Sequence, residues 1–206
     1  GNVSFYNETN SKSIFPTPVI GGIGIIDNLK RIVDIKTKKP GNLIISIGKT
    51  IGHITQSSFL QENFSIFEGP PPDINLMNEK NNGLTVLKLI RDNLILSAHD
   101  VSSGGILVAL AEMSINSGLG LKIYKPKKLS NLFEYFFGED QGRYLVEVSK
   151  NSLKKIEIFL KQNNVFFETV AEIQNDTFEI EKIFNLKTKE LHKHNNQWYH
   201  EFNAIN

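Results

Sequence analysis

Two hydrophobic periodicities alternate along most of this chain. Short apolar runs predict β-strands at residues 43–47, 94–98, 118–124, 143–148, 165–173 and 177–180. Apolar residues that recur every three or four positions predict longer helices at residues 73–91, 106–113 and 152–163. A further helix is expected at residues 57–61, a short helix or turn at 131–137, and the tail at 184–202 is expected to contain a polar helix. Strands alternating with helices indicate an α/β (α+β) fold with a mixed sheet flanked by helices.

The first forty residues follow a different pattern. Residues 2–9 have apolar positions in alternation, and residues 17–26 place glycines among β-branched residues, so both segments are predicted to be extended. A basic stretch that ends in a Pro-Gly pair then indicates a boundary. We expect a first unit at residues 1–38, the end of a domain that begins upstream, and a second unit at residues 42–204. The second unit is expected to fold by itself.

Composition narrows the classes of function. The chain has 23 Lys and Arg against 22 Asp and Glu, and this balance does not indicate nucleic acid or an anionic membrane as a partner. Because there are 0 cysteines, thiolate catalysis and cysteine-bound metals are excluded. No apolar run approaches the roughly 20 residues that span a bilayer, and no signal-peptide pattern opens the sequence. We therefore expect a cytoplasmic protein.

The turn between the strand at 94–98 and the helix at 106–113 is the first candidate site. Its polar and glycine residues are His99, Asp100, Ser102, Gly104 and Gly105. Ser102 or its neighbour could cap the helix, and the two glycines allow close approach of a backbone or a phosphate. The N–H groups and positive dipole end of a helix start suit an anion. A tight turn that binds nothing explains the same residues, so both interpretations stay open.

A second candidate lies at Glu139, Asp140 and Gln141, between an aromatic-rich segment and a strand. Two carboxylates flanked by glycines could bind Mg²⁺ or the hydroxyl groups of a substrate, whereas a solvated turn is the alternative. The 5 histidines form no convincing metal cluster. Patterns for a phosphate loop, a dinucleotide-binding turn or a nucleophile elbow are incomplete or absent.

Five strings in fixed order give the chain a specific resemblance. They are GNVSFYNETN at 1–10, PTPVIGGIG at 16–24, GPPP at 69–72, HDVSSGGILVALAE at 99–112 and FGEDQGRY at 137–144. Together they resemble the C-terminal portion of phosphoribosylformylglycinamidine synthase, the synthetase of purine biosynthesis. The first and last strings are specific, whereas the fourth is shared with aminoimidazole ribonucleotide synthetase and related enzymes. The resemblance implies an aminoimidazole ribonucleotide synthetase C-terminal-like domain, preceded by the end of an ATP-binding domain.

The resemblance also implies chemistry, cofactors and partners. Enzymes of this family use ATP and Mg²⁺ to convert formylglycinamide ribonucleotide and glutamine-derived ammonia into formylglycinamidine ribonucleotide. By match to the family motif, Gly1 would lie at ATP, Asn2 would bind Mg²⁺ and Ser4 would contact the substrate. The implied partners are a glutaminase subunit, a small accessory subunit and the N-terminal half of the synthetase. The tripeptide at 139–141 would be the counterpart of a substrate-binding tripeptide, either vestigial or a site for an auxiliary nucleotide.

The family's catalytic histidine and most of its metal-binding carboxylates belong to the first half of the synthetase, outside this sequence. We therefore expect no catalytic residue in this chain, and no turnover by the chain alone. Two alternatives stay open. One is part of another enzyme of the superfamily, such as aminoimidazole ribonucleotide synthetase, and the other is a non-catalytic assembly module that contacts a glutaminase.

Overall fold

A computed structural model describes residues 6–14, 20–26, 28–126 and 131–204. The chain divides into two compact units, Gly1–Lys30 and Arg31–Asn206. The start of the second unit is bonded to its sheet, because Ala98 N–H donates to the Asp34 carbonyl at 3.1 Å and Gly41 N–H to the Ile173 carbonyl at 2.7 Å. The domain boundaries expected from the sequence, at residues 38 and 42, stay a prediction.

The described part of the first unit contains one small hairpin. Strands β1 (Glu8–Thr9) and β2 (Lys12–Ser13) pair antiparallel. Of the extended segment expected at 2–9, residues 8–9 form a strand and residues 6–7 do not, whereas residues 2–5 lie outside the described part. The strand expected at 17–26 is wrong for residues 20–26, which have no strand structure, and residues 15–19 lie outside the described part. No described strand pairs with residues 20–26. A glycine-rich segment without a neighbour has little to hold it extended.

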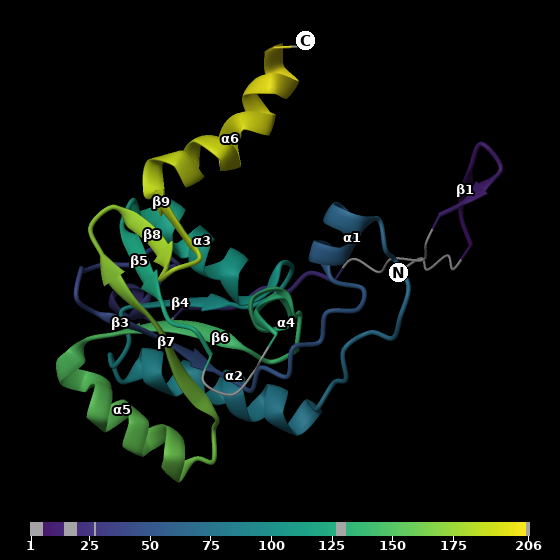
Figure 1. The fold of residues 1–206 in the computed structure, drawn as a ribbon. Coiled ribbons are helices and arrows are strands. Elements are labelled where there is room, and N and C mark those ends of the chain that lie inside the picture. Colours follow the sequence, from purple (N-terminus) through teal and green to yellow (C-terminus); the bar gives the residue numbers. More distant parts are fainter. Residues whose placement is uncertain (1–5, 15–19, 27, 127–130, 205–206) are drawn as a thin grey trace. The chain divides into compact units, whose positions relative to one another are not determined.

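The second unit is built on a seven-stranded sheet (Figure 1). Its strands lie in the order β4 (Ser97–Asp100), β6 (Tyr144–Val148), β3 (Leu43–Ile47), β7 (Phe167–Gln174), β5 (Gly120–Ile123), β8 (Thr177–Ile180) and β9 (Phe184–Lys187). The β5–β8 pair is parallel and the other neighbouring pairs of this sheet are antiparallel. The mixed sheet expected from the sequence is therefore confirmed.

Helices cover both faces of this sheet, so the interior strand β3 is buried on both sides. Helices α2 (Leu76–Arg91) and α5 (Lys150–Gln162) lie on one face, and α3 (Gly105–Ser117) and α4 (Leu132–Phe137) on the other (Figure 1). In β3, Ile44 packs into the cluster beneath α3, whereas Ile45 and Ile47 pack into the cluster with α2 and α5. Successive strand residues point to opposite faces, so one apolar run supplies both cores.

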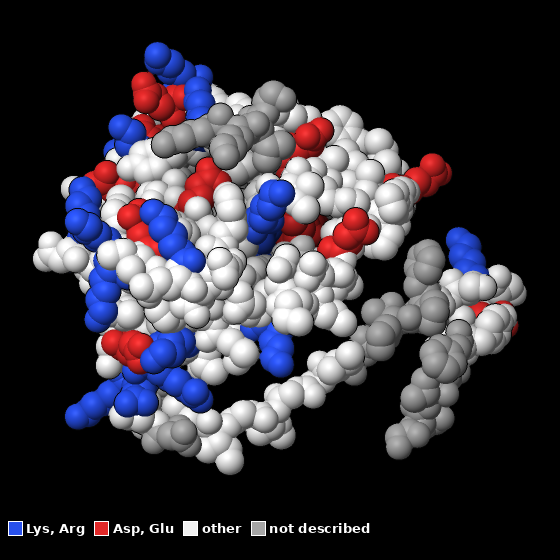
Figure 2. All heavy atoms as spheres, turned by 90° about the horizontal axis from the view of Figure 1, so that it is seen from below, with Lys and Arg blue, Asp and Glu red and all other residues white. Residues whose placement is uncertain are grey.

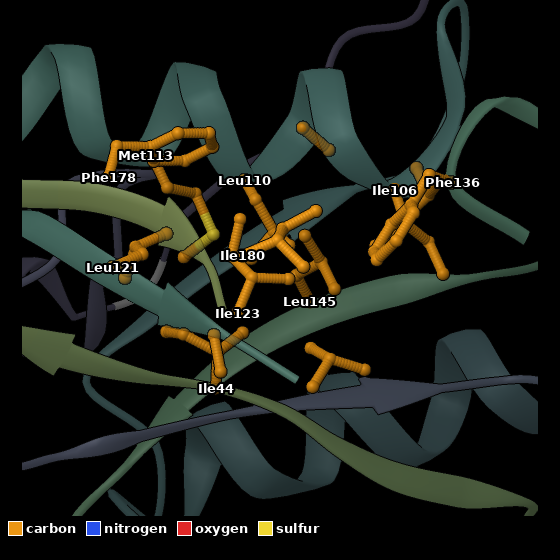
Figure 3. Close-up of a cluster of buried hydrophobic side chains, with 14 of the residues drawn as sticks. Ile44, Ile106, Leu110, Met113, Leu121, Ile123, Phe136, Leu145, Phe178 and Ile180 are labelled. Carbon is orange, nitrogen blue, oxygen red and sulfur yellow. The ribbon is translucent and has the colours of Figure 1, made fainter. Parts of the chain in front are cut away.

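Helix α3 packs on the sheet through the stripe that its sequence predicts. Ile106, Leu110 and Met113 point from the helix towards Ile123 and Leu145 of the strands (Figure 3). All three helical side chains are fully buried. Their spacing of four and three residues places them on one side of the helix. Packing of this side on the sheet positions the N-terminus of α3 beside the β4–α3 turn.

Several element boundaries differ from the prediction. Helix α2 is capped by Asn75, whose side chain accepts the Asn78 N–H at 3.0 Å, and not by Asp73. The strand expected at 94–98 begins later, because Leu94 N–H still donates to the Leu89 carbonyl in the turn that ends α2. The polar helix expected within the tail is present as α6 (Thr188–Ala204), and strand β9, which was not expected, precedes it. The remaining helices are η1 (Leu29–Arg31) and α1 (Ser58–Phe64).

A buried carboxylate binds residues 38–42, the segment that leads into β3, to the sheet. Glu147 of β6 is fully buried and accepts the N–H groups of Lys38 at 2.7 Å and Lys39 at 3.3 Å. Its other donors are the Asn42 side-chain amide at 2.7 Å and the Ser97 hydroxyl at 3.3 Å. Four donors compensate a charge that would otherwise be costly to bury. Glu147 therefore holds the chain that leads into β3 against the edge strand β4.

Replacing Glu147 with Ala should lower the free energy of unfolding of the full chain by about 2–4 kcal/mol, because it leaves several buried donors without an acceptor. The amide protons of Lys38 and Lys39 should also exchange with solvent faster. Urea unfolding and hydrogen exchange measure the two effects. Glu68→Ala, at an exposed residue, is the matched control. A loss no larger than that of the control would contradict the assignment.

Candidate functional site

The two candidate segments of the sequence meet at one end of the sheet. Three loops converge there: residues 48–57 between β3 and α1, 101–104 between β4 and α3, and 138–143 between α4 and β6. Gly104 N–H donates to the Glu139 carboxylate at 2.8 Å, which joins the two candidates directly. Val101 N–H donates to the Arg143 carbonyl at 2.9 Å and supports the same junction. Residues far apart in the sequence thus form one loop cluster.

Asp140 binds the loop that follows β3. Its buried carboxylate accepts three consecutive backbone N–H groups, from Ile51 at 2.9 Å, Gly52 at 2.9 Å and His53 at 3.1 Å. Gly52 has a φ of +91°, a conformation that glycine adopts without strain. Asp140 is therefore a buried structural acceptor rather than part of a solvated turn.

Glu139 binds the starts of two helices. One carboxylate oxygen accepts Ser58 N–H of α1 and Gly104 N–H at the start of α3, each at 2.8 Å. The serine cap expected for α3 is wrong, because Gly104 occupies the cap position with a φ of 82° and no side-chain cap bond. The cap comes instead from a distant carboxylate, which also complements the positive ends of the helix dipoles.

Arg143 is the residue of this cluster that the sequence did not single out. Its buried guanidinium donates to the carbonyls of Asp140 at 3.0 Å and Gly138 at 2.7 Å, and to the Thr50 hydroxyl at 3.2 Å. Burial lowers the pKa of Arg143, and the nearby Asp140 carboxylate opposes that shift. The sequence did offer one signal, because Arg143 directly precedes a buried apolar strand. A charged side chain in such a place needs hydrogen-bond or charge partners within the protein.

The other sequence candidates lie beside this cluster rather than in it. His99 is in strand β4, where its imidazole contacts the carboxylates of Asp100 at 3.3 Å and Glu112 at 2.7 Å. Ser102 is exposed, and the Gln141 side chain is exposed and donates to the Glu139 carbonyl at 3.4 Å.

The motif residues at the start of the chain, Gly1, Asn2 and Ser4, lie outside the described residues. Within the described part, no group of three or more His, Asp or Glu side chains is arranged to hold a metal ion. Acidic and basic side chains are both present on the face shown in Figure 2. Among the described helices, none combines the length and hydrophobicity that crossing a bilayer requires.

The two glycines of the β4–α3 turn meet protein rather than ligand. A Cβ on Gly105 would lie 2.7 Å from the carbonyl oxygens of Phe136 and Gly138, and one on Gly104 would lie 2.5 Å from a methyl group of Val108. The close backbone approach that the sequence predicts is therefore made by the chain's own α4 loop. The backbone of α3 is pressed against the loop that carries Glu139.

Comparison with known families decides the classification. The family model described as AIR synthase related protein, C-terminal domain, matches residues 39–182. The chain belongs to this family. The matched range contains the loop cluster and most of the seven-stranded sheet.

Curated relatives match almost the whole chain. The sequence is 45% identical over 198 residues to phosphoribosylformylglycinamidine synthase subunit PurL of Pelagibacter ubique, covering 96% of this chain and 27% of the relative. It is 38% identical over 202 residues to the PurL subunit of Bartonella bacilliformis, covering 98% and 27%. The chain thus spans about a quarter of the length of the curated relatives it matches.

Solved structures share the fold at lower identity. PurL of Thermotoga maritima in complex with FGAR matches with a TM-score of 0.65 and 20% identity, covering 80% of this chain and 30% of that chain. The hydrogenase maturation protein HypE of E. coli matches with a TM-score of 0.53 and 15% identity, covering 76% and 51%. These likenesses concern the fold alone, and they support the α/β class expected from the sequence.

A pair of glycine variants separates backbone strain from close contact in the turn. Gly105 and Gly118 have similar φ values of +70° and +75°, but a Cβ on Gly118 has nothing within 4 Å. Gly118→Ala should cost about 1–3 kcal/mol of unfolding free energy from backbone conformation. Gly105→Ala should cost a further ~1–3 kcal/mol because the new methyl group overlaps the α4 loop. Equal losses in urea unfolding would show that the close approach is unimportant.

Proposed function

We propose that this chain is part of a phosphoribosylformylglycinamidine synthase, an ATP-dependent ligase of purine biosynthesis. The observation that carries the proposal is the 45% identity to the PurL subunit of Pelagibacter ubique over 96% of the chain. The family model matches only residues 39–182, whereas the similarity to the PurL subunit extends beyond this range at both ends. Similarity outside the common domain favours the synthase over other members of the family, including aminoimidazole ribonucleotide synthetase.

The reaction proposed for the complete enzyme joins ammonia to formylglycinamide ribonucleotide. ATP supplies the phosphoryl group that activates the amide oxygen, and displacement by ammonia gives formylglycinamidine ribonucleotide, phosphate and ADP. A glutaminase subunit would deliver the ammonia from glutamine, with a small accessory subunit completing the assembly. The cytoplasm is the proposed location, since it is where purine biosynthesis takes place.

The contribution of this chain to the nucleotide site would come from its first residues. An amide oxygen of Asn2 is a suitable ligand for Mg²⁺, Gly1 would lie at ATP and the Ser4 hydroxyl would contact the substrate. The described residues contain no cluster of three or more possible metal ligands. The rest of the synthase would supply the carboxylates and the catalytic groups of the proposed site.

A chimera tests the proposed function. This chain replaces the matching quarter of the Pelagibacter ubique subunit, and conversion of formylglycinamide ribonucleotide is measured with ATP, Mg²⁺ and ammonia. We expect turnover from the chimera and none above a no-protein blank from residues 1–206 alone. The same subunit without the segment is the control. A folded chimera that is inactive here but converts formylglycinamidine ribonucleotide would instead identify an aminoimidazole ribonucleotide synthetase segment.

Asn2→Ala in the active chimera tests the proposed Mg²⁺ ligand. Loss of one oxygen ligand beside a transferring phosphoryl group should reduce turnover by roughly one to a few powers of ten, and higher Mg²⁺ should be needed for half-maximal rate. Lys12→Ala, in the exposed β1–β2 hairpin, is the control. An unchanged rate and Mg²⁺ titration would remove Asn2 from the site.

A further inference from the structure

The loop cluster has the construction of an anion-binding site, but its own side chains fill it. Three consecutive N–H groups, from residues 51–53, point to one carboxylate of Asp140. Two further N–H groups, from Ser58 and Gly104, point to one oxygen of Glu139. Converging backbone N–H groups of this kind are the elements with which proteins bind phosphate groups.

The two carboxylates differ in their access to solvent. Asp140 is buried, whereas Glu139 is only partly buried and lies between the starts of α1 and the 13-residue α3. A free anion that entered from solvent would therefore reach the Glu139 position first. To bind there it would have to displace a carboxylate that is covalently attached and already at hydrogen-bonding distance. Tethering gives the resident group a large advantage in effective concentration.

The local charges also oppose a second anion. The centre of the cluster holds the Glu139 and Asp140 carboxylates and the Arg143 guanidinium. The Arg143 donors are directed to two carbonyls, a hydroxyl and the Asp140 side chain. Arg143, the buried cation of the cluster, thus faces inward, whereas Lys49 of the 48–57 loop is exposed. A phosphate group placed beside Glu139 would meet the repulsion of that carboxylate at short range, and the Arg143 guanidinium is already engaged elsewhere.

We propose that Glu139 is a built-in ligand that occupies the anion position between α1 and α3, so that this loop cluster excludes phosphate-bearing ligands. This goes beyond the proposed function, because it concerns residues other than Gly1, Asn2 and Ser4, which are assigned to ATP, Mg²⁺ and substrate. It also decides between the two interpretations of the 139–141 tripeptide. An auxiliary nucleotide does not bind there, and the carboxylate serves to join the loops.

Anion rescue tests this proposal on the full chain, without any measurement of synthase activity. Glu139→Ala empties the position, and its thermal midpoint should fall by roughly 2–8 °C. Acetate or inorganic phosphate should restore part of that loss in a saturable way, whereas chloride at equal ionic strength should not. The wild type and Glu62→Ala, an exposed acidic residue on α1, should show only the same small general salt effect.

Two outcomes would overturn the proposal. If phosphate stabilises the wild type saturably and more than Glu62→Ala, the position is open to an external ligand. If no anion rescues Glu139→Ala, the N–H groups do not form an anion position. Should Glu139→Ala fail to fold, phosphate titration of the wild type, followed at the amide resonances of Ser58 and Gly104, decides the question. Unchanged resonances are expected, and saturable shifts would contradict the proposal.

Failure of this test and failure of the proposed function are distinguishable. An inactive chimera leaves the anion measurements on the 206-residue chain unaffected. Conversely, phosphate binding by the wild type would place a second ligand in the domain and would leave the ligase assignment unchanged.

Discussion

Buried backbone N–H groups need hydrogen-bond acceptors. In this domain, carboxylates between residues 139 and 147 accept such groups from loops at both ends of strand β6. Glu139 and Asp140 precede β6 and bind the loops before α1 and α3. Glu147 lies near the other end of β6 and binds the backbone that enters β3. Because β6 lies between β3 and β4, these three carboxylates hold both neighbouring strands and their connections in place. The loops are therefore held in fixed positions relative to the sheet.

In this arrangement the charged side chains of the loop cluster stabilise the loops. Charged groups that would suit metal or substrate in a sequence motif are engaged with the main chain in the folded domain. Arg143 completes the arrangement by donating to the same loop that carries the carboxylates. The reactive groups of the proposed ligase are thus expected at the N-terminal residues and in the rest of the enzyme.

The sequence predicted those features that depend on local periodicity. The burial of β3 on both faces follows from its apolar run, and the α3 stripe follows from the spacing of Ile106, Leu110 and Met113. Features that depend on distant contacts were out of reach. The acceptor for Ser58 N–H lies 81 residues away, at Glu139, and no local pattern indicates such a pairing. The start of β4 was misplaced because the turn after α2 takes up the first residues of its apolar run.

The position of β3 in the sheet has a consequence for how the chain folds during synthesis. Its partners are distant, since Leu43 lies opposite Val148 of β6 and Glu172 of β7. When β3 leaves the ribosome, neither neighbour exists, and helices α2 and α3 are made before β6 and β7, against which their apolar faces become buried. Such long-range pairing slows folding and leaves apolar segments exposed to association meanwhile. The nascent domain therefore acquires its native core only after β7 has emerged. A ribosome that stalls earlier would hold a partly folded chain whose exposed apolar segments are targets for chaperones.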